Sequence, residues 1–245
     1  MFLFRRSALL LALCLASASV VVAQSSSSNP PADPQPQAPL PAARQPQGPV
    51  SVQGRIRARR DARRAQSIRD AYMHTYETSV GMGYLRFTPG PGLQRVTYYG
   101  WDTAFTRYYS ERLGVTLDGR GYYGTPYVGL NFSSITRPAV STYTAMGGPT
   151  YRFYLQPKYS ISGRVMGGYA YGNFSADTNG FGGKALGLWA DGGTFAVTGG
   201  LIGEYNVSPG LSLRLGGEYF GTGFGSTLQN NVGFTTGFVY RFGKQ

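Results

Sequence analysis

The sequence contains one cysteine and one histidine, so it offers little material for catalysis or metal binding. Cys14 lies in an apolar N-terminal stretch, and removal of that stretch during export would leave a mature chain without thiols. Such a chain can form no disulfide, cysteine–zinc site or thiol intermediate. His74 does not belong to a recognisable nucleophile–base or metal-binding motif. We therefore predict no catalytic, cofactor-binding or metal-binding residues and no enzymatic activity.

Long apolar runs are also missing beyond residue 23, where nothing approaches the roughly 20 apolar residues of a membrane helix. Residues 1–23 have the features of an export signal: Arg5 and Arg6 precede an apolar stretch that ends in small residues at Ala23. A membrane anchor would be near its minimum length here. A lipid-modified Cys14 is disfavoured because Leu13, before it, is not small. We predict cleavage before Gln24.

The next two segments differ in composition. Residues 24–54 are rich in Ser, Pro and Gln and predict a disordered linker. Residues 55–75 are basic and compatible with a short helix on which Ala58, Ala62, Ala65 and Tyr72 share a weak stripe. Their basic residues are Arg55, Arg57, Arg59, Arg60, Arg63, Arg64 and Arg69. This segment is either a solvated spacer or a patch that binds anionic lipid or peptidoglycan carboxylates.

The net charge of +12 is concentrated in that basic segment. Residues 76–245 hold 13 Lys and Arg against eight Asp and Glu, which is only mildly basic. The overall charge is therefore no indication of nucleic-acid binding.

What the chain has in abundance is glycine and aromatic residues, with 36 Gly, 19 Tyr and 14 Phe. This composition is typical of short strands and turns. From Tyr76 onward, large apolar residues alternate with small or polar ones; Leu211, Leu213 and Leu215, for example, share one face of a strand. The pattern predicts eight strands of about the length of a tilted membrane crossing. They cover residues 76–87, 97–109, 113–124, 141–155, 159–171, 195–205, 211–219 and 232–242.

The two strand faces favour a membrane barrel over a soluble sandwich. A sandwich would carry many charged residues on its polar face, whereas here that face is mostly Gly, Ser, Thr and Ala with isolated charges. The apolar face carries aromatic residues near the strand ends, as membrane interfaces require. These are Tyr76, Tyr84, Trp101, Tyr109, Tyr123, Tyr151, Phe153, Tyr159, Tyr169, Tyr171, Tyr205, Tyr219, Tyr240 and Phe242. We predict an all-β, eight-stranded, antiparallel up-and-down transmembrane barrel over residues 76–245.

Short and long connections alternate along this region. Residues 110–112, 156–158 and 206–210 form tight turns, and residues 125–140, 172–193 and 221–231 form long loops. The exception is the short first loop, residues 88–92. In outer-membrane barrels the long loops face outward, so we expect the turns, the N-terminal segment and His74 to be periplasmic. Asp177 and Asp191 share one loop, and we interpret them as solvated residues rather than as a weak cation site.

Residues 76–242 resemble the small outer-membrane barrels typified by the OmpA transmembrane domain and OmpX. The resemblance rests on the eight strands, the short inner turns, the phrases at 111–115 and 148–153, and the final strand 232–242. In that family the barrel assembly machinery reads an aromatic residue at the end of the last strand. Phe242 corresponds to it, although Gly243, Lys244 and Gln245 follow. The resemblance implies an outer-membrane location, among outer-membrane lipid and lipopolysaccharide, and implies no activity.

Charged residues fall on the inward face of the predicted strands and must pair there, because unpaired buried charge is very costly. They are Asp102, Asp118, Arg120, Arg152, Arg164, Glu204, Arg214, Glu218 and Arg241. A tight turn at 110–112 would place Asp102 opposite Arg120, and Glu204 would lie within diagonal reach of Arg214. The charges form either a plug that fixes the barrel shape or a gate that opens a small pore.

Three functions follow from these features. The first is a structural or surface-interaction barrel whose lumen is plugged by paired charges. The second is a small gated channel, although an eight-stranded barrel is only just wide enough for side chains to fill it. The third is an envelope tether that acts through the basic segment, without a peptidoglycan-binding domain like the one that follows the barrel in OmpA.

Overall fold

The computed structural model describes residues 51–129 and 131–244. The predicted signal and nearly all of the predicted linker therefore lie outside the described residues. The described part begins with one helix, α2 (Val52–Tyr72), which starts three residues before the predicted basic segment. Eight strands follow, with bounds close to those predicted. They are β1 (His74–Phe87), β2 (Val96–Tyr108), β3 (Leu113–Gly124), β4 (Val140–Leu155), β5 (Tyr159–Asn173), β6 (Gly192–Ser208), β7 (Leu211–Thr222) and β8 (Gln229–Lys244).

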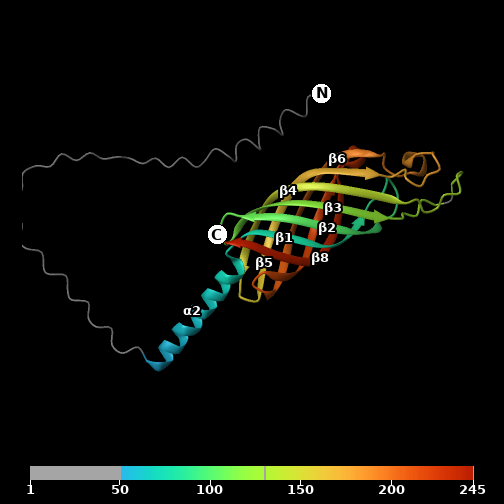
Figure 1. Cartoon of the computed structure of the whole chain (residues 1–245). Helices are drawn as coiled ribbons and strands as arrows, with labels where there is room; N and C mark the ends of the chain where they lie inside the picture. The colour runs from blue at the N-terminus through green and yellow to red at the C-terminus, as the bar shows by residue number, and fades with distance from the viewer. Residues whose placement is uncertain (1–50, 130, 245) are drawn as a thin grey trace, which may run out of the picture. The chain divides into compact units, whose positions relative to one another are not determined.

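The eight strands form one closed antiparallel barrel in which each pairs with its neighbours in sequence and β1 pairs with β8 (Figure 1). The predicted fold class is confirmed. Closure satisfies the backbone hydrogen bonds of β1 and β8, which would otherwise be exposed edges. The register pairs Asp102 with Arg120 and Glu204 directly with Arg214, which is closer than the diagonal approach expected for the second pair.

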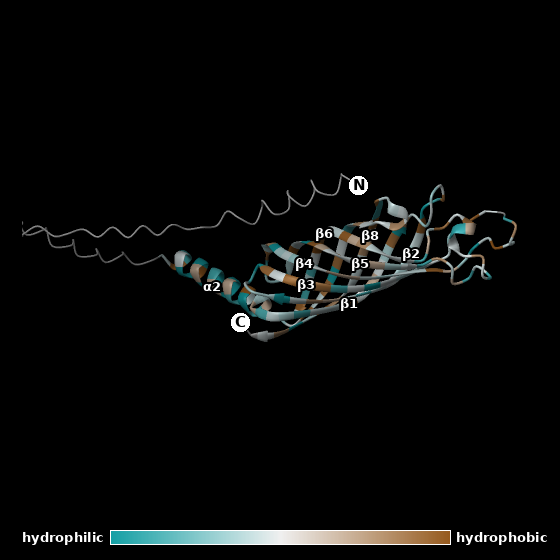
Figure 2. Cartoon of the chain, turned by 90° about the horizontal axis from the view of Figure 1, so that it is seen from above, coloured by the Kyte–Doolittle hydropathy of each residue, from teal (hydrophilic) through white to brown (hydrophobic). Residues whose placement is uncertain are grey.

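The strands alternate between outward and inward residues over nearly their full length. On β7, Leu211, Leu213 and Leu215 are exposed, whereas Ser212 and Arg214 are buried. Figure 2 shows the alternation of hydrophobic and hydrophilic residues along the strands. Because the buried set is the more polar one, the barrel is apolar outside and polar inside over much of its length.

The two ends of the barrel differ, as the connection lengths predicted. One end, which we call the turn end, carries the tight turns, and α2 and the C-terminus lie there (Figure 1). The other, the loop end, carries four connections, including two short 3₁₀ helices, η1 (Gly183–Leu186) and η2 (Phe224–Ser226).

Helix α2 begins at Ser51, whose side-chain oxygen accepts a hydrogen bond from the Gly54 amide at 3.1 Å. Its side chains are exposed except for the half-buried Ile68 and for the last turn, where Ala71 and Tyr72 are buried. One residue, Met73, separates the helix from β1.

No helix among the described residues is long and apolar enough to cross a membrane.

Candidate functional site

The lumen contains every inward charge predicted from the sequence and one more, Glu77. These ten residues are at most 8% exposed, and they comprise five carboxylates and five guanidinium groups. The lumen is therefore electrically balanced without any bound ion. The charges divide into two groups, one nearer each end of the barrel.

The loop-side cluster consists of Asp102, Asp118, Arg120, Arg164 and Glu218. Arg120 lies at its centre, with Nε 3.1 Å from Asp102 Oδ2 and 2.6 Å from Asp118 Oδ1, and it also pairs with Glu218 across the lumen. Arg164 extends the network, with Nη1 3.4 Å from Asp118 and Nη2 3.2 Å from Glu218. Side chains from β2, β3, β5 and β7 are thereby joined through the middle of the barrel.

The turn-side cluster consists of Glu77, Arg152, Glu204, Arg214 and Arg241. Glu77 accepts from Arg152 Nη2 at 2.6 Å and from Arg241 Nε at 3.2 Å, and it also pairs with Arg214. Glu204 lies 2.6 Å from Arg214 Nη2 and also pairs with Arg241. Asn206 Oδ1 accepts a hydrogen bond from Arg241 Nη1 at 2.8 Å.

The two clusters have opposite net charge. Three carboxylates face two arginines in the loop-side cluster, and two carboxylates face three arginines in the turn-side cluster. Each cluster depends on the other for overall neutrality. Since every guanidinium touches at least one carboxylate, the arrangement avoids the cost of an unpaired buried charge.

Glu77 is the lumen residue that the sequence analysis missed. It follows Tyr76, which is on the outward face, so strict alternation already places Glu77 inward. In the barrel it pairs with Arg241 on β8 and with Thr106 on β2. With Glu77 included, the acids and bases of the lumen match in number.

Tyr72 is a second residue of the candidate site whose place the sequence did not indicate, since in the helix pattern it belongs only to a weak stripe. Its side chain is fully buried at the turn end. Its hydroxyl donates to the Gln156 carbonyl at 3.0 Å and accepts from Asn206 Nδ2 at 2.7 Å. Its ring lies 5.2 Å from the guanidinium carbon of Arg152 and 5.0 Å from that of Arg241. The last turn of α2 thus covers the turn-side cluster.

The loop end of the lumen is filled by an apolar cluster, whereas the sequence analysis expected small and polar residues throughout. Its central rings are stacked or edge-on: Phe87 lies 4.9 Å from Tyr98 and 6.4 Å from Phe174. The loops close over it, because Trp189 Nε1 donates to the Thr88 carbonyl at 2.7 Å. We call it the aromatic cap; its members are Leu85, Phe87, Tyr98, Tyr122, Val140, Met146, Met166, Ala170, Phe174, Leu186, Leu188, Ala196, Phe220 and Phe224.

The remaining candidates lie outside the lumen. Phe242 is on the outward face, stacked 5.7 Å from Tyr76 and 5.8 Å from Tyr240. His74 is the first residue of β1, whereas the predicted strand began after it at residue 76, and it lies opposite Lys244 in the β1–β8 register. Asp191 Oδ1 accepts a hydrogen bond from the Phe174 amide at 2.6 Å, which links the two ends of its loop. No group of three or more His, Cys, Asp or Glu suited to a metal occurs in residues 51–129 and 131–244.

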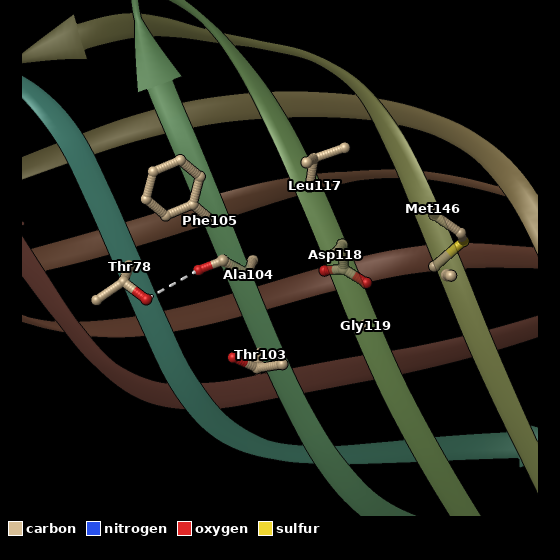
Figure 3. A pocket seen from close by; sticks show the side chains of 9 residues that line it. Thr78, Thr103, Ala104, Phe105, Leu117, Asp118, Gly119 and Met146 are labelled. Atoms are coloured by element: carbon tan, nitrogen blue, oxygen red, sulfur yellow. Dashed lines mark hydrogen bonds between the residues drawn. The ribbon is translucent and has the colours of Figure 1, made fainter.

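A hollow of about 500 Å³ lies on the outer wall over β2 and β3 (Figure 3). Small or apolar residues such as Thr103, Phe105 and Gly119 line it, and Thr78 Oγ1 donates to the Ala104 carbonyl at 3.4 Å. Asp118 also borders it, but its carboxylate belongs to the loop-side cluster. The hollow therefore presents no free catalytic group.

Comparison with known proteins gives no match to a family model and none to a curated protein. Solved structures do match. Ail, the attachment invasion locus protein of Yersinia pestis, is 16% identical, with a TM-score of 0.46 over 69% of this chain and 100% of its own. Neisserial surface protein A is 13% identical, with a TM-score of 0.47 over 69% and 97%. OprG from Pseudomonas aeruginosa is 12% identical, with a TM-score of 0.48 over 71% and 99%. These three solved structures are small outer-membrane β-barrels.

Proposed function

We propose that this protein is an outer-membrane barrel with a structural or surface-interaction role and a lumen that is closed to solutes. The observation that carries the proposal is a closed barrel with an apolar outer surface around a charge-balanced interior. The proposal includes no enzymatic activity, since the charged groups of the lumen are committed to one another.

The outer surface supports a membrane location. Outward residues at mid-barrel are large and apolar; Met82, Leu117 and Leu201 are 68%, 63% and 61% exposed. A soluble protein rarely presents so continuous an apolar surface to water. In a bilayer that surface contacts lipid, and closure leaves no backbone edge to be satisfied.

Aromatic residues mark both borders of this surface. Tyr159, Tyr205 and Tyr240 lie outward near the turn end, and Tyr99, Tyr123 and Tyr171 lie outward near the loop end. Tyrosine favours the membrane–water interface because its ring is apolar and its hydroxyl is polar. We infer that the loop end faces outside the cell and that the turn end, with α2, faces the periplasm.

Three layers of side chains support a closed lumen. The aromatic cap fills the loop end, the loop-side cluster crosses the middle, and the turn-side cluster lies beneath Tyr72 at the other end. A pore would require all three layers to move. No observation favours the channel as a second function.

The loops supply the surface for interaction. Tyr127, Phe132 and Phe181 are 59%, 73% and 51% exposed there, and the rings of Phe132 and Phe181 touch edge-on at 5.2 Å. These aromatic residues lie on the connections of the loop end, so in the inferred orientation they face lipopolysaccharide or partners outside the cell. Assembly through recognition of Phe242, which is exposed at the end of β8, belongs to the same proposal.

The test is conductance of the purified full chain in planar lipid bilayers, combined with fractionation of the envelope. We expect the protein in the outer-membrane fraction and no steady openings on the nanosiemens scale. Steady openings would overturn the closed lumen and favour the small channel. A soluble periplasmic protein would overturn the membrane location.

A further inference from the structure

Helix α2 is a strongly cationic helix, which we call the cationic rod. It carries seven arginines and only two acids, Asp61 and Asp70. All of its arginine side chains are exposed. Within the described part of the chain, Arg57, Arg59, Arg60 and Arg63 form no ion pair with a carboxylate.

This charge pattern is unfavourable for an isolated helix. Arg55 and Arg59, Arg59 and Arg63, and Arg60 and Arg64 are spaced four residues apart, where like charges repel. The first turn has no acidic residue to balance the positive end of the helix dipole. Arg55 lies close to that end, where a positive charge is unfavourable. A polyanion bound along the helix would add an attraction at each arginine and so offset these repulsions. The sequence of α2 is therefore better suited to a bound helix than to a free one.

The arginines leave open only the weak stripe of small residues at Ala58, Ala62 and Ala65, which ends at the buried Tyr72. At 100° per residue, the seven side chains spread over about two thirds of the helix circumference. An interfacial helix needs a continuous apolar face to enter lipid head groups. Here Val52 and Ile56 are the large apolar residues of the first turns, and both are exposed. The pattern fits an extended anionic polymer better than it fits a membrane surface.

The rod is joined stiffly to the barrel. Tyr72 is buried against the turn-side cluster, and only Met73 separates it from β1. About two turns earlier, Arg64 Nη2 donates to the Gln156 side-chain oxygen on the β4–β5 turn. Beyond that contact the twelve residues back to Val52 extend about 18 Å from the turn end. That reach is about twice the Debye length of ~8 Å at physiological ionic strength, so attraction between the N-terminal end of the helix and the lipid leaflet is largely screened.

From these features we propose that α2 binds the carboxylates of cell-wall peptidoglycan and fixes the barrel to that polymer. The inference rests on the proposed function for one point, the periplasmic position of the turn end. Guanidinium groups pair well with carboxylates, and a polymer with regularly spaced carboxylates can engage several arginines at once.

The experiment is co-sedimentation of the full chain, in detergent micelles, with purified peptidoglycan sacculi. The test variant is Arg57→Gln, Arg59→Gln, Arg60→Gln and Arg63→Gln, which spares the docked Arg64. The matched control removes four exposed cations near or on the loops: Arg86→Gln, Arg95→Gln, Arg137→Gln and Lys184→Gln. We expect the control to bind like the wild type and the test variant to bind at least about tenfold more weakly.

Two further arms identify the ligand. Amidation of the sacculus carboxylates should abolish binding of the wild type, and persistent binding would overturn the proposal. Vesicles of phosphatidylglycerol and phosphatidylethanolamine should bind more weakly than sacculi, and the reverse order would assign α2 to lipid instead. Equal binding by test and control variants would also overturn it.

Electrophoresis with and without boiling separates this inference from the proposed function. A heat-dependent mobility shift in all three proteins shows that each barrel is folded, so a loss of binding then belongs to α2. A chain that binds sacculi but shows no shift would contradict the barrel proposal and leave the cationic rod standing.

Discussion

Glu77 pairs with three arginines, which makes it the most connected carboxylate of the turn-side cluster. It joins β1 to β4, β7 and β8 through Arg152, Arg214 and Arg241. Glu77 can lose one of its arginine partners and remain paired. The arginines have fewer carboxylate partners: within the described residues, Arg152 pairs with Glu77 alone, and Arg214 and Arg241 each have Glu204 as a second partner. Glu204 pairs with only two of them.

The substitution Glu77→Gln should therefore destabilise the barrel strongly. It keeps the shape of the side chain but raises the net charge of the turn-side cluster by one, and breaking a buried ion pair typically costs about 3–5 kcal/mol. The measurement is the free energy of unfolding in urea with the protein in lipid vesicles. Asp177→Asn, on an exposed loop, should have little effect. Equal stability of Glu77→Gln and wild type would show that the network does not stabilise the fold.

At the scale of elements, the last turn of α2 acts as part of the barrel rather than as the end of a separate helix. The Ala71 carbonyl accepts from Arg241 Nη1 at 3.5 Å, at the end of the helix where the dipole is negative. Tyr72 adds two hydrogen bonds and two cation–π contacts.

Tyr72→Ala should lower the free energy of unfolding by about 3–5 kcal/mol, the usual cost of truncating a buried aromatic residue. The matched control is Tyr127→Ala, an aromatic side chain that is 59% exposed on a loop. The same urea titration compares both variants with the wild type. If the two variants were equally stable, α2 would not be docked in the way described.

The aromatic cap should also hold the loop before β6 against the barrel. Phe174→Ala removes a ring that lies 6.4 Å from Phe87 and 5.2 Å from Phe224, so the loop before β6 should open more often. Trypsin should then cleave after the exposed Lys184 several-fold faster, as followed by mass spectrometry of the fragments. Leu228→Ala, at an exposed position between β7 and β8, is the control. Unchanged cleavage would mean that the cap does not hold this loop.

At the scale of the whole molecule, closure makes the barrel cooperative, since no strand can leave without breaking two ladders of hydrogen bonds. The ion pairs across the lumen add contacts between strands that are not neighbours, such as Arg120 on β3 and Glu218 on β7.

The purified protein should therefore remain folded in sodium dodecyl sulfate until it is heated, and it should migrate differently before and after boiling. Semi-native electrophoresis checks this. A single band with unchanged mobility would contradict a closed membrane barrel, whereas two bands with a sharp transition on a temperature series would agree with all-or-none unfolding.

The sequence by itself determined the strands, their faces and the pairing across tight turns. These depend on local patterns: alternation assigns each side chain to one face, and a short turn sets the register, as for Asp102 and Arg120. The alternation even placed Glu77 inward, although its importance was not apparent without its partners.

Only the tertiary structure decided what meets inside the barrel. Glu77 and Arg152 are 75 residues apart and lie on strands that are not neighbours, so their contact depends on closure and on the stagger of all eight strands. The same applies to Tyr72, which reaches the turn-side cluster only because α2 ends directly at β1. It also applies to the aromatic cap, whose rings come from separate strands and loops. Local periodicity gives a direction for each side chain, but the closed barrel decides its partner.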